Sequence, residues 1–251
     1  LNSSAHRFWG QDSSEIELHL DEPVFEGQYS NTCYTNRIKE ALEHLNVQKE
    51  TNFLHEWNQL IFHLPYAFQG RRMITPMWVN WMVENKQSEV LKSETGLDIP
   101  EENSSDWNAF VKACSKTPAY KAYINANIAK GEIASSDIGN MYTASIFMSF
   151  ISYLFAATEN NEDITGQTVG FLSYGSGSKS KVFSGVIQDN YLEKVKDLDL
   201  FNTLKNRQAI DFKTYEQLQK KELKSPLREN QLNLKKIGRE ENDLGYRYYN
   251  A

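Results

Sequence analysis

The longest mainly apolar stretch of the sequence, "MYTASIFMSFISYLFAA" from Met141 to Ala157, carries no charged residue and limits the possible folds strongly. A helix built from it would be apolar all round, and such a helix must be covered by protein or by lipid. The stretch carries a threonine and three serines and is shorter than the roughly 20 residues of a membrane span. We therefore expect a helix buried inside a soluble protein, with no membrane segment.

Three other segments predict β structure. The apolar run 60–62 leads into His63 and predicts a short buried strand with an imidazole at its exit. Further on, "TVGFLSYGSGSKSKVFSGVI" (Thr168 to Ile187) predicts two strands joined by a glycine- and serine-rich loop at 175–180. "EIELHL" (Glu15 to Leu20) alternates polar and apolar residues, as a half-exposed strand does.

Helical patterns fill most of the remaining sequence. Ser30 or Asn31 could cap a helix whose apolar residues follow as Ile38, Leu42 and Leu45. Residues 67–85 predict a helix that Pro76 disturbs. The order of strands and helices indicates a mixed α/β fold.

The segments before and after the buried helix are less regular. Residues 86–106 are polar and predict a surface excursion, and helical spacing then runs over 107–132 and ends near Gly131. The buried helix is expected to begin around Asn140, with Asp137 as its cap and Gly139 allowing backbones to approach closely. From about Asn190 onward, alternating charged and apolar residues predict peripheral helices.

Composition narrows the functional classes. Of the 251 residues 40% are hydrophobic, enough for a substantial core, and the net charge of −6 argues against a nucleic-acid partner. Cys33 and Cys114 are the two cysteines, and the sequence offers no metal-ligand spacing, which favours a reducing cytoplasm and no metal site. Neither cysteine lies in an apolar, glycine-rich elbow, so we expect neither to be an acyl-transfer nucleophile.

Polar groups stand at the edges of three strongly apolar elements: His63 after its strand, Asn140 at a helix start, and the loop Tyr174 to Ser178. A buried imidazole or amide without a hydrogen bond costs about 1–3 kcal/mol, so such groups pair with each other or with a substrate carbonyl. Each also has a structural alternative: a satisfied core histidine, a helix cap and a flexible hairpin turn.

Two arginines follow the histidine closely. Arg71 and Arg72 could bind a phosphate, or they could lie on a solvated helix face. The glycine-rich loop at 175–180 could also cradle a phosphate, but its spacing is neither that of a P-loop nor that of a dinucleotide-binding fingerprint.

Taken together, four segments resemble the 3-hydroxy-3-methylglutaryl-CoA (HMG-CoA) synthases, which belong to the thiolase-like superfamily. In chain order they are "EPVFEGQYSNTCY", "FHLPYAFQGRR", "IGNMYTAS" and "FLSYGSGSKS", which extend from about Pro23 to Lys181. The resemblance covers the C-terminal portion of such an enzyme. The residues of these motifs and the closing "GYRYYNA" are most similar to those of the family's members in Bacteroidetes-type bacteria.

The resemblance implies an α/β fold, the C-terminal half of a thiolase-like fold with layers in the order α-β-α and helical insertions. Residues 1–251 would form one C-terminal domain, in which 86–130 are an insertion and 190–251 a peripheral segment. Met141 to Ala157 would be the buried central helix. Such enzymes commonly form homodimers.

The resemblance also implies a chemistry. A cysteine takes the acetyl group of acetyl-CoA as a thioester, a glutamate removes a proton from the acetyl methyl group, and the carbanion equivalent attacks the ketone of acetoacetyl-CoA before water releases the product. No further cofactor is implied. By resemblance, His63 polarises the acetoacetyl group and Asn140 is the active-site asparagine. Lining residues would be Tyr142, Tyr174, Gly175, Ser176 and Gly177.

Two departures from the family pattern matter. The family often carries a CoA-contacting lysine five residues after the histidine, where this chain has Phe68; Arg71 or Arg72 could take over that contact. The nucleophilic cysteine and basic glutamate belong to the N-terminal half, so we predict that this chain alone cannot turn over acetyl-CoA. Two alternatives stay open: a β-branching enzyme acting on carrier-protein-bound polyketides, and a non-catalytic acyl-CoA-binding module.

Overall fold

The computed structural model describes residues 26–102, 104–175, 178–223 and 233–250. The chain divides into two compact units, one ending at Lys205 and the other beginning at Asn206, and each is described by itself. The strand expected at Glu15 to Leu20 lies outside the described residues.

A three-stranded sheet forms the centre of the first unit. Its strands are β1 (Gln59–Phe62), β2 (Thr168–Gly175) and β3 (Lys179–Val186), in the order β1-β2-β3. β1 runs parallel to β2, with Ile61 opposite Phe171, and β2 and β3 form an antiparallel hairpin. The strand before His63 and the paired strands of 168–187 are therefore confirmed.

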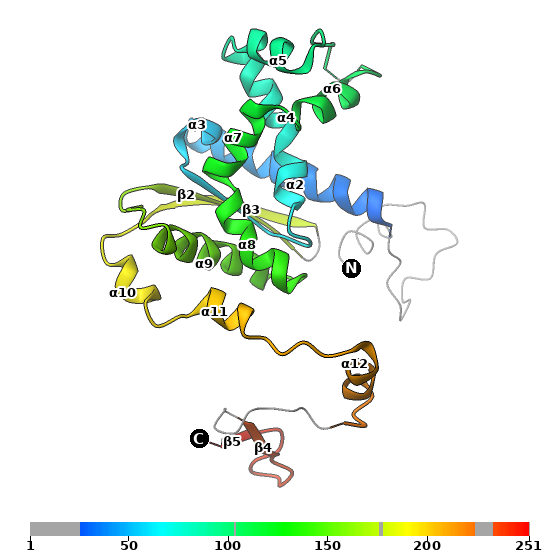
Figure 1. Cartoon of the computed structure of the whole chain (residues 1–251), viewed down its shortest axis with the longest axis vertical. Helices are drawn as coiled ribbons and strands as arrows, with labels where there is room; N and C mark the ends of the chain where they lie inside the picture. Colours follow the sequence, from blue (N-terminus) through cyan, green and yellow to red (C-terminus); the bar gives the residue numbers. More distant parts are fainter. Residues whose placement is uncertain (1–25, 103, 176–177, 224–232, 251) are drawn as a thin grey trace. The chain divides into compact units, whose positions relative to one another are not determined.

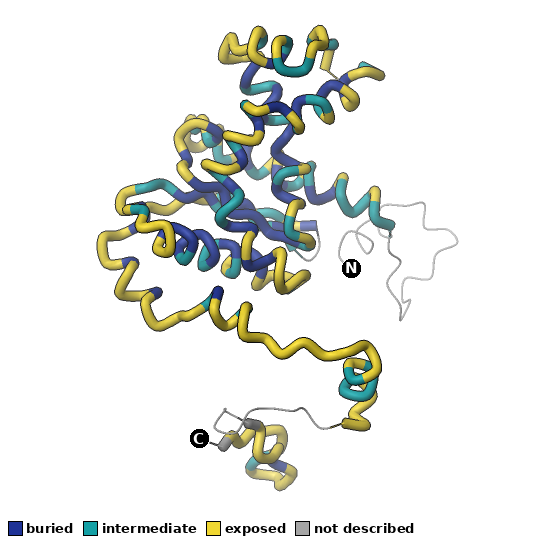
Figure 2. The backbone as a smooth tube through the Cα atoms, viewed as in Figure 1, coloured by how far each residue is buried: buried dark blue, intermediate teal, exposed yellow. Residues whose placement is uncertain are grey.

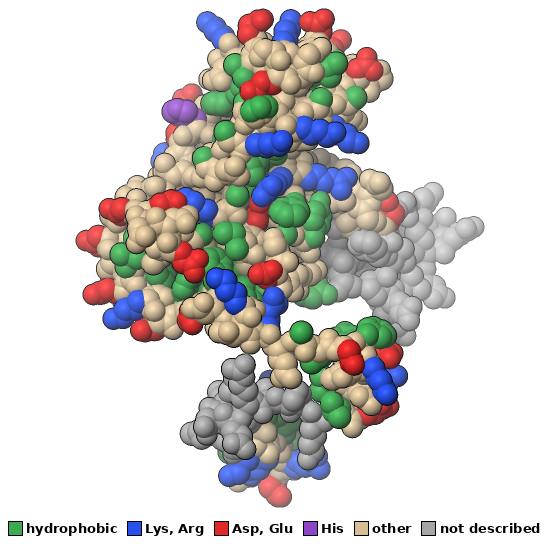
Figure 3. All heavy atoms as spheres, in the orientation of Figure 1, with side chains coloured by type: hydrophobic (Ala, Val, Ile, Leu, Met, Phe, Trp, Pro, Cys, Tyr) green, Lys and Arg blue, Asp and Glu red, His purple; other side chains and the backbone are tan. Residues whose placement is uncertain are grey.

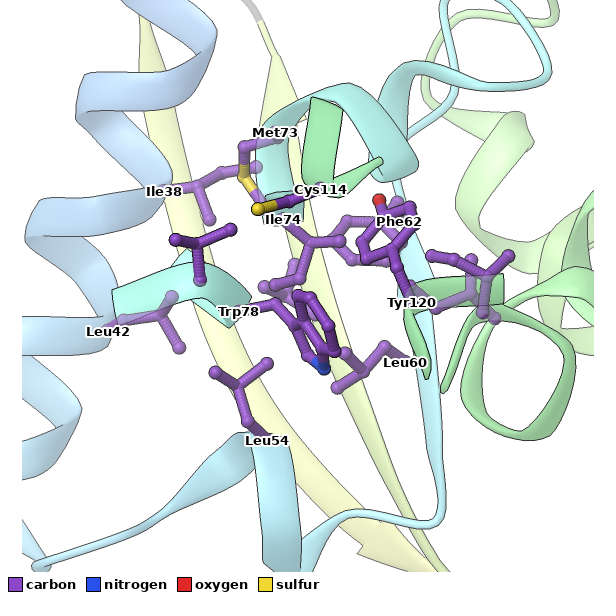
Figure 4. Close-up of a cluster of buried hydrophobic side chains, with 14 of the residues drawn as sticks. Ile38, Leu42, Leu54, Leu60, Phe62, Met73, Ile74, Trp78, Cys114 and Tyr120 are labelled. Carbon is purple, nitrogen blue, oxygen red and sulfur yellow. The ribbon is translucent and has the colours of Figure 1, made fainter. Parts of the chain in front are cut away.

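Helices cover both faces of this sheet (Figure 1). Leu60 and Phe62 point into a core shared with α2 (Gly27–Gln48) and α4 (Gln69–Glu84), whereas Ile61 packs with α9 (Ala144–Glu159). Alternate residues of a strand point to opposite faces, so the buried run of β1 serves two cores at once. Figure 4 shows the first core, in which Trp78 of α4 lies among Leu60, Ile38 and Leu42. The layer order is α-β-α, as expected.

The predicted start of α2 is wrong. The helix begins at Gly27, and its cap is Glu26, whose carboxylate accepts the N–H groups of Gln28 and Tyr29. Because the side chain of Glu26 satisfies these first donors, Ser30 and Asn31 lie inside the helix. The predicted helix over 67–85 is confirmed as α4, which carries Pro76 in its interior.

The region 86–138 is more helical than the sequence suggests. α5 (Ser88–Thr95) lies in the expected surface excursion and buries Leu91 completely. Three helices follow: α6 (Trp107–Cys114), α7 (Pro118–Asn127) and α8 (Ala129–Ile138). The expected helix end near Gly131 is wrong, because α8 continues through Gly131 to Ile138. A Cβ atom at position 131 would lie only 2.7 Å from Ser149 Oγ. Gly131 lets α8 and α9 approach, rather than ending a helix.

The start of the buried helix also differs from the prediction. Asp137 belongs to α8, and Gly139 ends α8 with a φ of +87° and open space around its Cα. This glycine therefore serves a backbone conformation, not a close approach. α9 begins at Ala144, four residues after Asn140 and with Thr143 at its N-cap. Figure 2 shows that α9 and the sheet hold much of the buried backbone.

The short helices α3 (Phe53–Glu56), α10 (Tyr191–Val195) and α11 (Leu200–Lys205) complete the first unit. The second unit contains α12 (Phe212–Gln219) and a hairpin of β4 (Asn233–Ile237) and β5 (Arg247–Asn250). Peripheral helices were expected after Asn190, but this hairpin was not. No helix in the described ranges is long and apolar enough to cross a membrane.

Candidate active site

His63 follows β1 directly and stands at the carboxyl end of the parallel strand pair. Its N–H continues the ladder by donating to Leu172 O at 3.0 Å, and its own carbonyl accepts a hydrogen bond from Tyr34 Oη at 2.8 Å. The residue is 9% exposed. Two hydrogen bonds thus fix its backbone, and the orientation of the imidazole ring depends on separate contacts.

The imidazole is held by α9. Ser145 Oγ lies 3.1 Å from His63 Nδ1 and accepts the N–H of Leu64 at 2.9 Å. Burial lowers the pKa of His63 below its usual 6.5, because the protein interior disfavours the charged ring. At neutral pH the imidazole is therefore neutral, with one nitrogen carrying a proton.

Two tyrosines stand beside the imidazole. The ring centres of Tyr34 and Tyr174 lie 6.4 Å and 6.2 Å from that of His63, and the two phenol rings meet edge to face at 5.1 Å. Burial raises the pKa of Tyr34, so its hydroxyl stays neutral. The structure thus brings Tyr174 of the glycine-rich segment next to His63, in surroundings of low polarity.

Asn140 and Tyr142 lie in the turn that joins α8 to α9. The Asn140 Oδ1 accepts the Tyr142 N–H at 2.7 Å, and Tyr142 has a φ of +51°, which is uncommon for a residue other than glycine. Asn140 caps this turn, not the helix, and among the described residues its Nδ2 has no hydrogen-bond partner. In the part of the chain that the structure describes, no hydrogen bond joins either residue to His63; both are exposed.

The described residues include only part of the glycine-rich loop. Gly175 ends β2, whereas Ser176 and Gly177 lie outside the described residues. Ser178 follows with a φ of +52° and is buried. The expected lining role of Ser176 and Gly177 stays a prediction.

The two arginines have different surroundings. Arg71 donates from Nε to Glu132 Oε2 at 2.7 Å, and its guanidinium lies 4.7 Å from the ring centre of Phe68. Glu132 is 3% exposed, and burial raises its pKa while Arg71 opposes that shift. Arg71 is therefore held by Glu132, and both arginines line a hollow of about 850 Å³.

That hollow lies between α4, α6 and α7. Its charged lining residues are Arg71, Arg72, Lys112 and Lys121, and they stand beside Tyr120 and several amides. Figure 3 shows Lys and Arg side chains gathered over this part of the surface. No acidic residue is among the lining residues in the described part of the chain, so the hollow offers positive charge to an anion.

No pattern in the sequence indicates that Tyr34 and Ser145 contact His63, or that Glu132 pairs with Arg71. Ser145 ends the quoted "IGNMYTAS", but nothing in that string indicates which residue its hydroxyl meets.

Both cysteines are buried, and burial raises the pKa of Cys114 to about 11, which makes its thiol unreactive. Among the described residues, no three His, Cys, Asp or Glu side chains gather in a way that could hold a metal ion.

The family profile described as "Hydroxymethylglutaryl-coenzyme A synthase C terminal" matches residues 14–247 of this chain. The chain belongs to this family. The Haloferax volcanii hydroxymethylglutaryl-CoA synthase is 26% identical to it over 201 residues, which make up 77% of this chain and 45% of the relative. The human cytoplasmic enzyme is 26% identical over 197 residues, or 71% of this chain and 36% of the relative. The chain thus spans less than half the length of these curated relatives.

Solved structures of HMG synthases share the fold. MvaS in complex with 3-hydroxy-3-methylglutaryl coenzyme A superposes with a TM-score of 0.61 at 22% identity, covering 93% of this chain and 53% of that one. The HMG synthase of the curacin biosynthetic pathway gives 0.57 at 21% identity, covering 81% and 42%. The expected fold, the C-terminal portion of a thiolase-like HMG-CoA synthase, is confirmed.

Proposed function

We propose that this chain forms the acetoacetyl-binding side of a hydroxymethylglutaryl-CoA synthase, which condenses acetyl-CoA with acetoacetyl-CoA to HMG-CoA and free CoA. The observation that carries the proposal is the state of His63, a neutral imidazole whose Nδ1 already has a partner in Ser145. Its Nε2 is the nitrogen left for a substrate. A ring N–H there would donate to the ketone oxygen, where negative charge develops, and one such donor contributes about 3 kcal/mol in a dry site.

In this proposal the acetyl thioester forms on a cysteine in a part of the enzyme that the C-terminal family profile does not cover. A glutamate in that same part removes a proton from the acetyl methyl group. The new carbon–carbon bond forms at the ketone carbon of acetoacetyl-CoA, whose oxygen becomes an alkoxide and is protonated. Water then cleaves the thioester to the cysteine. His63 and the amide Nδ2 of Asn140 stabilise the oxygen as it gains charge, and Tyr142 and Tyr174 line the acyl group.

The basic hollow supports the acyl-CoA part of the proposal. Arg72, Lys112 and Lys121 would meet the phosphates of CoA, which carry several negative charges. The lysine that the family often has is replaced by Phe68, but Phe68 holds the Arg71 guanidinium against its ring, so this turn of the chain keeps a cation.

Several finer points belong to the same proposal. The enzyme would act in the mevalonate route to isoprenoids, in the cytoplasm, as a homodimer, and without a cofactor beyond its two thioester substrates. Acyl-CoA would be its ligand, with no nucleic acid and no membrane as partner.

The test is an assay of the full-length protein that carries this chain, given acetyl-CoA and acetoacetyl-CoA. Loss of the acetoacetyl enolate absorbance with matching release of free CoA supports the proposal. Activity confined to carrier-protein thioesters would favour the β-branching alternative. The observation that supports this alternative is Phe68, which stands where the family often has a CoA-contacting lysine. Saturable CoA binding without condensation would mean a binding module.

A further inference from the structure

Ser145 stands between three parts of the site. It is fully buried near the start of α9, and its hydroxyl reaches the exit of β1, 82 positions earlier in the chain. There it meets both His63 Nδ1, at 3.1 Å, and the N–H of Leu64, at 2.9 Å. The turn that holds Asn140 lies five residues before it, so one helix start carries both groups.

The hydrogen count at this hydroxyl fixes the direction of its bonds. A backbone N–H can only donate, so Leu64 N–H is the donor and Ser145 Oγ the acceptor of this hydrogen bond. The hydroxyl then has one proton of its own to place, and in the described part of the chain His63 Nδ1 is the acceptor within reach. If Nδ1 accepts, it carries no proton, and in a neutral ring the proton must then be on Nε2.

The opposite arrangement would be poorer. If Nδ1 carried the proton and donated to Ser145, the serine oxygen would accept two hydrogen bonds and its own buried proton would have no partner. An unsatisfied buried hydroxyl costs about 1–3 kcal/mol. The network therefore assigns the proton to Nε2.

We propose that Ser145 is a positioning residue for the condensation: its hydroxyl holds His63 in the tautomer that presents an N–H to the substrate ketone. This inference rests on the proposed function, because it assumes that His63 meets a carbonyl oxygen. The backbone of His63 is fixed separately, by Tyr34 and Leu172. Ser145 thus contacts the ring through Nδ1 and the adjoining backbone through the Leu64 N–H, whereas the N–H and carbonyl of His63 itself have other partners.

α9 offers a matched control. Ser152 is as completely buried as Ser145, and its hydroxyl also makes two bonds, accepting from Ala134 N at 3.2 Å and donating to Lys130 O at 2.8 Å. Neither partner belongs to the site. Ser145→Ala and Ser152→Ala therefore remove the same group from the same helix, and only the first removes a partner of His63.

The direct readout is the nitrogen NMR spectrum of ¹⁵N-histidine-labelled full-length protein, with the His63 signals identified by their loss in His63→Gln. We expect an unprotonated Nδ1 and a protonated Nε2 in the parent protein and in Ser152→Ala. In Ser145→Ala we expect a mixture of tautomers. A protonated Nδ1 in the parent, or an unchanged ring in Ser145→Ala, would overturn the proposal.

Kinetics supply the second readout. Ser145→Ala should lower kcat for condensation between about 10- and 100-fold, because a misaligned donor loses transition-state stabilisation, with little change in KM. Ser145→Thr, which keeps a hydroxyl, should recover the Nε2 tautomer and part of the rate. A loss in Ser145→Ala no larger than that in Ser152→Ala would contradict the positioning role. If the parent protein does not condense these substrates, the proposed function fails, while the NMR measurement still decides the tautomer.

Discussion

The hydroxyl of Tyr34 donates a hydrogen bond of 2.8 Å to the carbonyl oxygen of His63, joining α2 to the exit of β1 across 29 positions. Tyr34 is 1% exposed, so this bond forms away from solvent. It explains why the segment that carries Tyr34 belongs with the histidine segment in one site. The relationship also makes the contribution of a single hydroxyl measurable.

Tyr34→Phe should destabilise the protein by about 1–3 kcal/mol, because it leaves the buried carbonyl of His63 without this donor. The matched control is Tyr123→Phe. The Tyr123 hydroxyl is also buried but has no hydrogen-bond partner among the described residues, so its removal should be neutral or stabilising. Urea unfolding measures both. Equal losses in the two variants would contradict the role of the Tyr34 hydrogen bond.

The pH dependence of stability should report the burial of His63. Its folded-state pKa is lowered below 6.5, so below pH 6.5 the unfolded chain takes up a proton before the folded one does. The unfolded state gains from this, and stability falls as the pH drops below 6.5 until the folded-state pKa is reached. His63→Gln should lack this part of the loss. Denaturant titrations of both proteins from pH 7.5 downward test it, and parallel curves would count against a buried neutral ring.

Arg71→Ala should destabilise the protein at neutral pH by about 2 kcal/mol. This is less than for a fully buried pair, because Arg71 is itself 37% exposed. Burial raises the pKa of Glu132 in the folded protein above its value in the unfolded chain. Glu132 therefore contributes to stability when the pH is below its unfolded-state pKa, and this contribution is lost as the pH rises through its folded-state pKa. Without Arg71 that pKa rises further. The penalty should therefore shrink as the pH is lowered toward 4.5, and a penalty independent of pH would show that Glu132 is not the cause.

Asn140→Asp should separate the turn from the chemistry. The new carboxylate keeps an oxygen for the Tyr142 N–H, so the melting temperature should change little, whereas the amide donor is lost. We expect condensation to slow by about 100-fold, as when a donor to a developing oxyanion is removed. A variant that folds and retains its rate would remove Asn140 from the proposed site.

Arg72→Ala should raise the KM for acyl-CoA about 10-fold with kcat nearly unchanged, the pattern of binding shared by ground and transition states. Lys194→Ala, an exposed cation on α10, is the control and should have no effect. The difference should shrink at high salt, since exposed charges are screened. Equal KM values in the two variants would place the CoA phosphates elsewhere.

The local parts of the fold could be predicted from the sequence, because their causes are local. Composition and periodicity predict three of these elements: the apolar strand before His63, the hairpin with its glycine-rich loop, and the apolar helix α9. The helix start at Gly27 was missed because glutamate is a less typical cap than the serine and asparagine that follow it. Gly131 looked like a helix end but is a packing contact with α9.

The site could be predicted only where a motif gave the residue. His63, directly after β1, and Tyr174, on the neighbouring strand β2, both come from quoted motifs and lie side by side. Ser145 and Glu132 could not be foreseen, since their partners lie 82 and 61 positions away. Such pairings arise from how the helices pack on the sheet, and a sequence pattern of period two or 3.6 carries no information about them.

In the proposed function His63 acts on the second substrate, and measuring the two half-reactions of the full-length protein separately isolates this role. His63→Ala should still form the acetyl-enzyme from labelled acetyl-CoA, because in the proposed mechanism His63 takes no part in the acetylation step. Its condensation with acetoacetyl-CoA should fall by about 100-fold or more. A His63→Ala protein that folds normally and condenses at the parent rate, or that loses acetylation and condensation equally, would show that His63 does not act specifically on acetoacetyl-CoA.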